Sequence, residues 1–206
     1  QGRFYIRYPA SFQANPREDN NAVDLLRGQA TGSVSAFAGQ VPVDSTRGIV
    51  YEFVYGTKTP LDSYTAGPDS LAASVGRAIA AIHGLPTSFV ADAGLPVMTA
   101  GECLRSCVTV MDRAAATGLV PAALLGRWER AAEDAKLWQF QPTVINGSLA
   151  ADSFLQQDGS VTGVLGWQDL RVGDPARDMQ WLLGSHSDAI IDSAFDAYSR
   201  LRGASD

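Results

Sequence analysis

The chain has 206 residues, of which 46% are hydrophobic and 18% are charged. That composition supports a packed core and excludes a wholly disordered chain. The formal net charge is −6 and no run of Lys and Arg stands out, so we expect no nucleic-acid partner. No stretch approaches the roughly 20 apolar residues of a membrane span, and no signal peptide is visible at Gln1. We therefore expect a cytoplasmic protein without membrane insertion.

The beginning of the chain predicts a small, mostly antiparallel sheet with one helix against it. Residues that favour β-structure mark the strands, and apolar residues at helical spacing mark the helix. The segments, in order, are a strand over 4–8, a helix over 17–27, and strands over 33–38 and 48–55 joined by a polar turn near 44–46. The chain opens like the tail of a hairpin, so we expect earlier strands of this sheet to be missing from it.

A linker rich in Gly and Pro covers 56–68, and a mainly helical region follows it. Helices are predicted over 70–83, 102–116, 121–137, 176–183 and 188–202. Short strands are predicted over 143–145, 153–156 and 161–165, the last two joined by a tight turn at Asp158 and Gly159. The larger aromatic and apolar residues of this region are interpreted as packing residues: Trp128, Leu137, Trp138, Trp167 and Trp181.

Cysteine and histidine chemistry is not favoured by the sequence. Cys103 and Cys107 are four residues apart in a predicted helix, where a disulfide is geometrically poor, so we expect buried or half-buried helix residues. His83 and His186 lie far apart and belong to no cluster of metal ligands. Zinc chemistry and Cys/His catalysis are therefore not expected.

One window, from Thr143 to Asp178, is far more specific than the rest. It contains Asn146-Gly147-Ser148-Leu149, then an Asp-Gly turn, then Val161-Thr-Gly-Val-Leu-Gly166-Trp167 and Gly173-Asp174-Pro175-Ala-Arg-Asp178. This resembles the aminoglycoside and macrolide phosphotransferase family, whose pattern reads H-G-D-x-x-x-x-N, then V-T-G-V-I-D-W and G-D-P-x-x-D. Upstream, Gly48–Gly56 resembles the hinge strand of that family, and Ser74–Pro86 resembles its first C-lobe helix.

The resemblance implies four chemical positions in this window. The family has a His that holds the catalytic loop, an Asp that takes the proton of the attacking hydroxyl, and an Asn and a second Asp that bind magnesium and the nucleotide phosphates. In this chain those positions hold Asn146, Ser148, Ser153 and Gly166. The scaffold residues around them do match the family: Gly147, Leu149, Leu155, Gly159, Gly163, Val164, Trp167, Gly173, Asp174, Pro175 and Asp178.

The family's reactive residues are replaced at these four positions while the scaffold residues are retained. This pattern indicates a protein that has kept the fold and lost the phosphotransfer reaction. A serine hydroxyl is a poor base near neutral pH, and glycine offers magnesium no side-chain ligand. Asp152 and Asp169 are the nearby carboxylates that a relocated metal site would use, and the commoner reading of each is a solvated loop residue. Ser148 as a nucleophile is disfavoured, because no His lies near it in sequence.

The remaining expectations from the resemblance concern the residues that would bind a nucleotide and those that would support the catalytic loop. Arg7 would be the phosphate-binding basic residue, and its acidic partner would be Glu18 or Asp19, or Asn21 in another register. The backbone at Glu52, Phe53 and Val54 would receive an adenine edge, although the alternating aromatic residues Tyr51, Phe53 and Tyr55 are more simply sheet packing. Asp174 and Asp178 are expected to cap and brace the loop rather than to react.

The sequence thus predicts an α+β, protein-kinase-like fold in two lobes, with an incomplete N-lobe over 1–55 and a helical C-lobe over 56–206. The favoured function is a catalytically inactive member of the phosphotransferase family that binds a partner protein, a nucleotide without metal, or a small ligand. No cofactor is expected, although ATP without metal is compatible with the sequence. Two alternatives stay open: an active ATP-dependent kinase of a small hydroxylated molecule that uses Asp152 or Asp169, and a binder of small cationic ligands.

Overall fold

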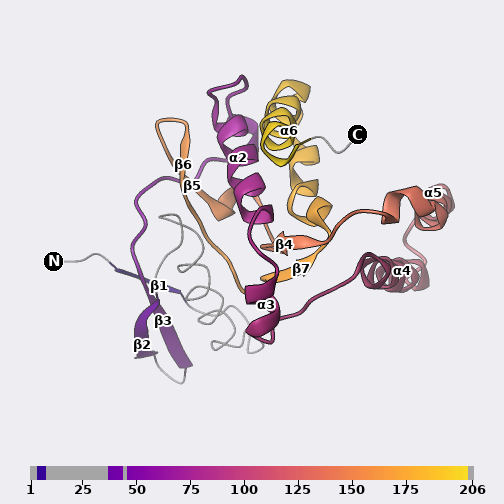
Figure 1. The fold of residues 1–206 in the computed structure, drawn as a ribbon, viewed down its shortest axis with the longest axis horizontal. Helices are drawn as coiled ribbons and strands as arrows, with labels where there is room; N and C mark the ends of the chain where they lie inside the picture. Colours follow the sequence, from indigo (N-terminus) through magenta and orange to yellow (C-terminus); the bar gives the residue numbers. More distant parts are fainter. Residues whose placement is uncertain (1–3, 8–36, 44–45, 204–206) are drawn as a thin grey trace.

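The computed structural model describes residues 4–7, 37–43 and 46–203. The predicted helix over 17–27 lies outside the described residues, as do Glu18, Asp19 and Asn21. The chain forms a three-stranded sheet on one side and a mainly helical body on the other, which contains two further pairs of short strands (Figure 1). This mixture of helices and small sheets agrees with the predicted α+β class.

The three-stranded sheet is antiparallel, as predicted, with the order β1-β3-β2. Its strands are β1 (Phe4–Arg7), β2 (Phe37–Val43) and β3 (Thr46–Glu52). Arg7 pairs with Ile49, and Val43 pairs with Thr46. β3 ends at Glu52 rather than at the predicted Tyr55, because the chain then turns towards the helical body.

The chain after β3 is attached to the strands β5 (Phe154–Gln157) and β6 (Ser160–Val164). The Thr57 and Gln156 backbones each donate one hydrogen bond to the other, at 2.9 and 3.0 Å, and the Thr162 hydroxyl donates to the Tyr55 carbonyl at 2.6 Å. Gly56 has a φ of +149°, and a Cβ there would lie 2.5 Å from the Thr162 hydroxyl oxygen. Only glycine fits such a conformation and approach.

The core of the helical body lies around α2 (Leu71–His83) and α6 (Asp188–Arg202). The Ser70 hydroxyl accepts a hydrogen bond from the Ala73 amide and so caps α2, and Gly84 ends this helix as predicted. Gly76 lets the two helices pack closely, because a Cβ there would collide with the Ala194 carbonyl. The largest fully buried residues include Phe154, Ile79, Ile145, Leu182, His83, Asn146 and Asp178.

Two pairs of short strands lie against this core. β5 and β6 form the predicted hairpin, with positive φ at both turn residues, 51° at Asp158 and 76° at Gly159, as a type I′ turn requires. β4 (Thr143–Ile145) pairs with β7 (Arg171–Gly173), a strand that the sequence pattern did not reveal. Three residues without clear alternation are too few to indicate a strand.

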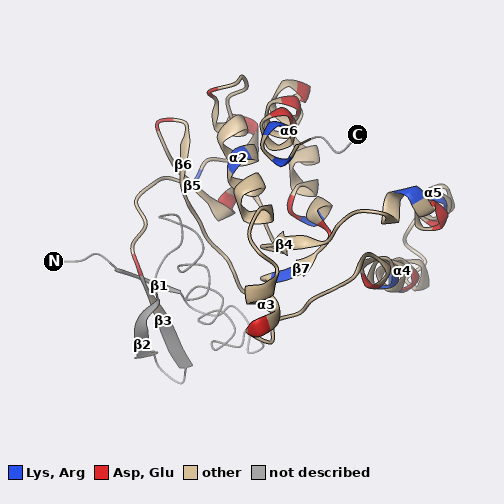
Figure 2. Cartoon of the chain, in the orientation of Figure 1, with Lys and Arg blue, Asp and Glu red and all other residues tan. Residues whose placement is uncertain are grey.

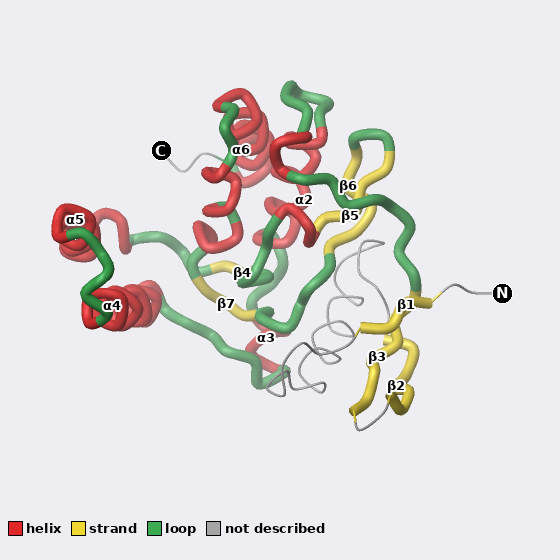
Figure 3. Tube along the Cα trace, turned by 180° about the vertical axis from the view of Figure 1, so that it is seen from behind, coloured by secondary structure: helices red, strands yellow, loops and turns green. Residues whose placement is uncertain are grey.

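Helices α4 (Ala100–Ala116) and α5 (Ala122–Glu133) form a hairpin at the end of the molecule away from the β1–β3 sheet (Figures 1 and 3). The predicted third helix ends four residues early. The Asp134 carboxylate accepts from the Lys136 amide, which turns the chain into the 3-10 helix η2 (Ala135–Trp138). The hairpin has no fully buried residue, so the prediction of a packed Leu137 is wrong, with 57% of that residue exposed.

Other expectations for this region need correction as well. Cys103 is half-buried as expected, but Cys107 is exposed. Trp128 and Trp138 are half-buried on the hairpin, whereas Trp167 is buried in the core. The short α3 (Ser88–Asp92) was not predicted.

The predicted helix over 176–183 is instead two 3-10 helices, η4 (Pro175–Asp178) and η5 (Gln180–Gly184). The Trp181 indole donates to the Asp178 carbonyl at 2.9 Å. A side chain therefore satisfies a carbonyl that a regular α-helix would bond through its backbone. Two more 3-10 helices, η1 (Leu61–Ser63) and η3 (Ala151–Ser153), complete the body.

Acidic and basic residues are interspersed on the helices of the described part of the chain (Figure 2). None of the described helices is both long and apolar enough to cross a membrane.

Candidate functional site

The site lies in the loop from Asn146 to Ser153, between β4 and β5. Asn146, which the resemblance predicts at the position of the loop-holding His, is fully buried. Its side-chain amide donates to the Gly166 carbonyl at 3.0 Å, and its side-chain oxygen accepts from the Ser148 amide at 3.2 Å. Asn146 therefore joins the loop to the segment that follows β6.

Ser148, which the resemblance predicts at the position of the catalytic Asp, is exposed, and its hydroxyl contacts two side-chain amides. Its hydroxyl donates to the Asn146 side-chain oxygen at 3.3 Å and accepts from the Gln168 side-chain amide at 3.4 Å. An amide oxygen is not a general base near neutral pH, so this contact does not activate the hydroxyl. His83 is not its partner, because the His83 ring contacts Asp178 and Tyr198 instead.

Ser153 and Gly166, which the resemblance predicts at the metal-binding positions of the family, lie in or beside this loop. The Ser153 hydroxyl accepts from the Ala150 amide at 3.1 Å, and the Ser153 carbonyl accepts from the Leu165 amide, beside Gly166. Gly166 has a φ of +77°. The structure thus brings all four predicted positions into one hydrogen-bonded region, but their donor set is one amide, two hydroxyls and no carboxylate. That set does not fit a magnesium ion, which proteins hold through carboxylates.

Asp178 braces the loop through its carboxylate, as the sequence predicted. Its two carboxylate oxygens accept hydrogen bonds from the Asn146 and Gly147 amides, each at 2.7 Å. The side chain is fully buried, and one of its oxygens lies 3.4 Å from Nε2 of His83. The other ring nitrogen of His83 lies 2.9 Å from the Tyr198 hydroxyl. The series of contacts from Asp178 through His83 to Tyr198 links the loop to both α2 and α6.

Burial is the main cause that raises the pKa of the Tyr198 hydroxyl, so this residue stays protonated near neutral pH.

The conformation of Gly147 is constrained, with a φ of +87°, and a Cβ there would lie 2.6 Å from the Asp169 carbonyl oxygen. Gly147 is therefore required at this point by conformation and by space. The Arg177 guanidinium donates to the Gly147 carbonyl at 2.6 Å and so gives the loop a further attachment to η4.

Asp174 has the capping role that was predicted. Its carboxylate accepts from the Ala176 amide at 2.9 Å, with Pro175 in the first turn of η4.

The two candidate carboxylates for a relocated metal site each lie beside a basic residue. Asp152 is 3.9 Å from the Lys58 ammonium, and both side chains are largely exposed. Asp169 is 2.8 Å from the Arg171 guanidinium. Within the residues that the structure describes, no three His, Cys, Asp or Glu side chains converge as a metal site. Asp152 also acts on a neighbour: burial, and then the negative charge of Asp152, raise the pKa of Tyr64 to about 12.

The predicted nucleotide contacts lie on the three-stranded sheet and its exit. Arg7 is the last residue of β1, and Glu52 is the last of β3. Phe53 and Val54 follow, so the prediction that Phe53 and Tyr55 pack within the sheet is wrong. They are 38% and 60% exposed, and their rings meet edge to face at 5.1 Å between centroids. Arg7 and the backbone at Glu52, Phe53 and Val54 remain predicted contacts.

Some residues of the site could not be assigned from the sequence. Gln168, Arg177 and the pair of His83 and Tyr198 all contribute to the loop network, yet no spacing rule connects them to Ser148 or Asp178. One signal was the position of His83, four residues after Ile79 and eight after Val75, on the buried face of α2.

Similar solved structures define the class of fold. The macrolide 2'-phosphotransferase MphH from Brachybacterium faecium superposes with a TM-score of 0.80 at 22% identity, over 98% of this chain and 70% of that one. Macrolide 2'-phosphotransferase type I gives 0.79 at 21% identity, over the same shares. The gentamicin complex of APH(2")-IIa gives 0.65 at 17% identity, over 95% of this chain and 70% of that one. The chain has the kinase-like phosphotransferase fold.

Residues 27–205 match the sequence profile of the phosphotransferase enzyme family, APH, and the chain belongs to that family. It is also 26% identical over 111 residues to the uncharacterized protein YcbJ of Bacillus subtilis (strain 168). That similarity covers 53% of this chain and 36% of YcbJ, so the chain spans about a third of the length of this curated relative.

Proposed function

We propose that this chain is a phosphotransferase-family pseudoenzyme, which acts by binding a partner protein, a nucleotide or a small ligand and does not transfer a phosphoryl group. One observation carries the proposal. The residues that the resemblance places at the family's four chemical positions are Asn146, Ser148, Ser153 and Gly166, and the three side chains among them are used in hydrogen bonds within the loop or to Gly166.

Phosphoryl transfer needs a base or orienting group for the attacking hydroxyl, and cations that neutralise the phosphate oxygens. Ser148 supplies neither a base nor a charge, because its hydroxyl bridges two side-chain amides. Gly166 supplies no ligand for a cation. The brace from Asp178, which matches the family pattern, maintains the shape of the loop and supplies no group for the reaction.

The first experiment is calorimetric titration of the protein with ATP, with and without magnesium, together with an assay of ATP hydrolysis in the same buffers. The pseudoenzyme proposal expects no turnover, and any ATP binding should not strengthen with magnesium. Metal-independent binding would identify a nucleotide-binding pseudoenzyme, and absence of binding would direct the search to protein partners. Magnesium-dependent turnover that disappears in Asp152→Ala or Asp169→Ala would overturn the proposal in favour of an active kinase with a relocated metal site.

A restored variant provides the matched control. Combining Asn146→His, Ser148→Asp, Ser153→Asn and Gly166→Asp places the family's residue types on this scaffold. Asp is among the residues that best tolerate the positive φ of position 166. If the loss of these four groups is what removed metal binding, the restored variant should bind ATP more tightly with magnesium than without it, while the natural chain does not.

A further inference from the structure

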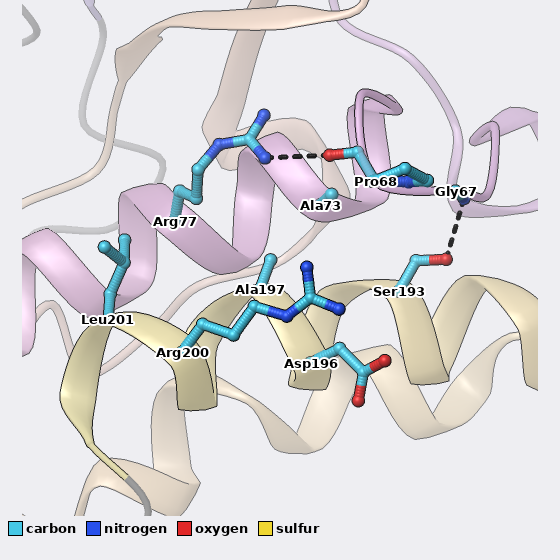
Figure 4. A pocket seen from close by; sticks show the side chains of 9 residues that line it. All are labelled: Gly67, Pro68, Ala73, Arg77, Ser193, Asp196, Ala197, Arg200 and Leu201. Carbon is cyan, nitrogen blue, oxygen red and sulfur yellow. Dashed lines mark hydrogen bonds between the residues drawn. The ribbon is translucent and has the colours of Figure 1, made fainter.

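A cavity lies between α2 and α6, and it shares no residue with the loop described above. Its volume is about 370 Å³, and its walls come from both helices and from the loop before α2 (Figure 4). Three ionisable residues line it: Arg77 from α2, and Asp196 and Arg200 from α6. The rest of the lining is small or apolar, with Ala73, Ala197 and Leu201 contributed by the two helices.

The wall formed by the loop is held in place by hydrogen bonds. The Gly67 amide donates to the Ser193 hydroxyl at 2.8 Å, and that hydroxyl donates to the Ala189 carbonyl at 2.6 Å. The Ser70 hydroxyl donates to the Gly67 carbonyl at 2.6 Å. The loop is thus fastened to α6 and to the start of α2, so the cavity is formed before any ligand arrives.

The guanidinium groups of Arg77 and Arg200 have N–H donors that no residue in the described part of the chain accepts. Arg77 uses one N–H on the Pro68 carbonyl at 3.0 Å, which fixes the direction of its side chain (Figure 4). Arg200 has no hydrogen bond or ion pair to any residue within the described part of the chain. A guanidinium carries five N–H donors in a planar fork that matches carboxylate and phosphate oxygens. The two arginines and Asp196 leave a net positive charge at this cavity in a chain whose formal net charge is −6.

We propose that the cavity between α2 and α6 binds a small molecule through an oxyanion, a phosphomonoester or a carboxylate, which Arg200 and Arg77 hold while its organic part lies on Ala73, Ala197 and Leu201. The volume is in the range of small-molecule sites. Oxyanions bound by arginine form short, charge-assisted hydrogen bonds, often in pairs. This site is independent of whether the chain transfers phosphate.

The test is calorimetric titration with inorganic phosphate and with phenyl phosphate, in a Tris-chloride buffer free of phosphate, sulfate and sulfonate. Saturable binding is expected, tighter for phenyl phosphate because of the apolar floor, and weaker as the salt concentration rises. Arg200→Gln should weaken the binding of both probes by about tenfold. Asp196→Asn should strengthen it a few-fold, because it removes a negative charge beside the anion.

Arg130→Gln is the matched control. Arg130 is also a basic residue in the last turn of a helix, α5, and it does not line the cavity. This variant should bind both probes as the natural protein does. The proposal is overturned if the natural protein shows no saturable binding up to about 10 mM of either probe, or if Arg200→Gln binds phosphate and phenyl phosphate as tightly as Arg130→Gln.

Discussion

Asp178 is the residue on which the shape of the candidate loop depends most. Replacing it with Ala leaves the Asn146 and Gly147 amides buried without their acceptors, which lie 2.7 Å from each nitrogen in the structure. A hydrogen bond to a charged group contributes ~1.5–3 kcal/mol, and an unsatisfied buried donor costs ~1–3 kcal/mol. Because two such donors are affected, we expect Asp178→Ala to lower the free energy of unfolding by about 3–5 kcal/mol.

Asp178→Asn tests the same contacts with almost no change in volume. One oxygen still accepts from one amide, but the new NH₂ group faces the other amide donor, so a loss of about 2 kcal/mol is expected. The measurement is urea unfolding followed by tryptophan fluorescence. Hydrogen exchange provides a local readout, because the Asn146 and Gly147 amides should exchange faster in this variant than in the natural protein.

Asp174→Ala is the control for these two variants. It removes a carboxylate four residues away that caps η4 from a partly exposed position, and it should cost only about 1 kcal/mol. If Asp178→Ala and Asp174→Ala have the same effect on stability, and Asp178→Asn leaves the exchange of Asn146 and Gly147 unchanged, the assignment of Asp178 as the brace of the loop is wrong.

Three further predictions concern the scaffold. Gly76→Ala should destabilise the protein by about 2 kcal/mol or more in the same unfolding assay, because its Cβ would collide with the Ala194 carbonyl. Gly126→Ala on α5 should be neutral or stabilising, because the nearest atom would be the end of Arg130 at 3.6 Å. Equal effects of the two variants would contradict the close packing of α2 and α6. Tyr64 should titrate with a pKa of about 12 in an alkaline absorbance titration, and Tyr64→Phe should remove that component. Since the folded pKa of Tyr64 is above its unfolded value of 10.0, stability should fall as the pH rises from about 10 to about 12, less so in the Phe variant. The hydrogen bonds from Thr99 lower the pKa of Glu102, so the protection of α4 against hydrogen exchange should be full at neutral pH and should decrease as the pH falls below the ordinary glutamate range. Thr99→Val should reduce this pH dependence of protection. An unchanged pH profile in Thr99→Val would exclude the capping box as the cause of the dependence.

The sequence predicted the elements that carry strong local signals. α2 has both a capping Ser70 and a terminating Gly84, and the predicted helix over 188–202 coincides with α6. The β5–β6 hairpin was predicted because Asp158-Gly159 is a strong type I′ turn signal. In these segments the local propensity and the tertiary packing favour the same structure.

The elements that were not predicted depend on contacts that are distant in sequence. η4 and η5 replaced a predicted α-helix because the Asp178 carboxylate accepts from the loop and the Trp181 indole donates to the Asp178 carbonyl. β7 is defined only by its pairing with β4. In the site, the four chemical positions stay predictions from the family pattern, whereas the hydrogen bonds among those residues, and the link from Asp178 through His83 to Tyr198, required the fold.

The attachment of Thr57 to Gln156 limits how the two halves of the molecule can move. Residues 55–57 are bonded to β5 and β6, and Gly56 fits closely against Thr162 and Leu155, so this stretch must move with the helical body. Any swing of the β1–β3 sheet relative to α2 therefore has its pivot in the few backbone torsions between Glu52 and Tyr55. A pivot this short allows few axes of rotation. A proline placed within those residues would fix one of these torsions and so narrow the range of angles between the sheet and the helices.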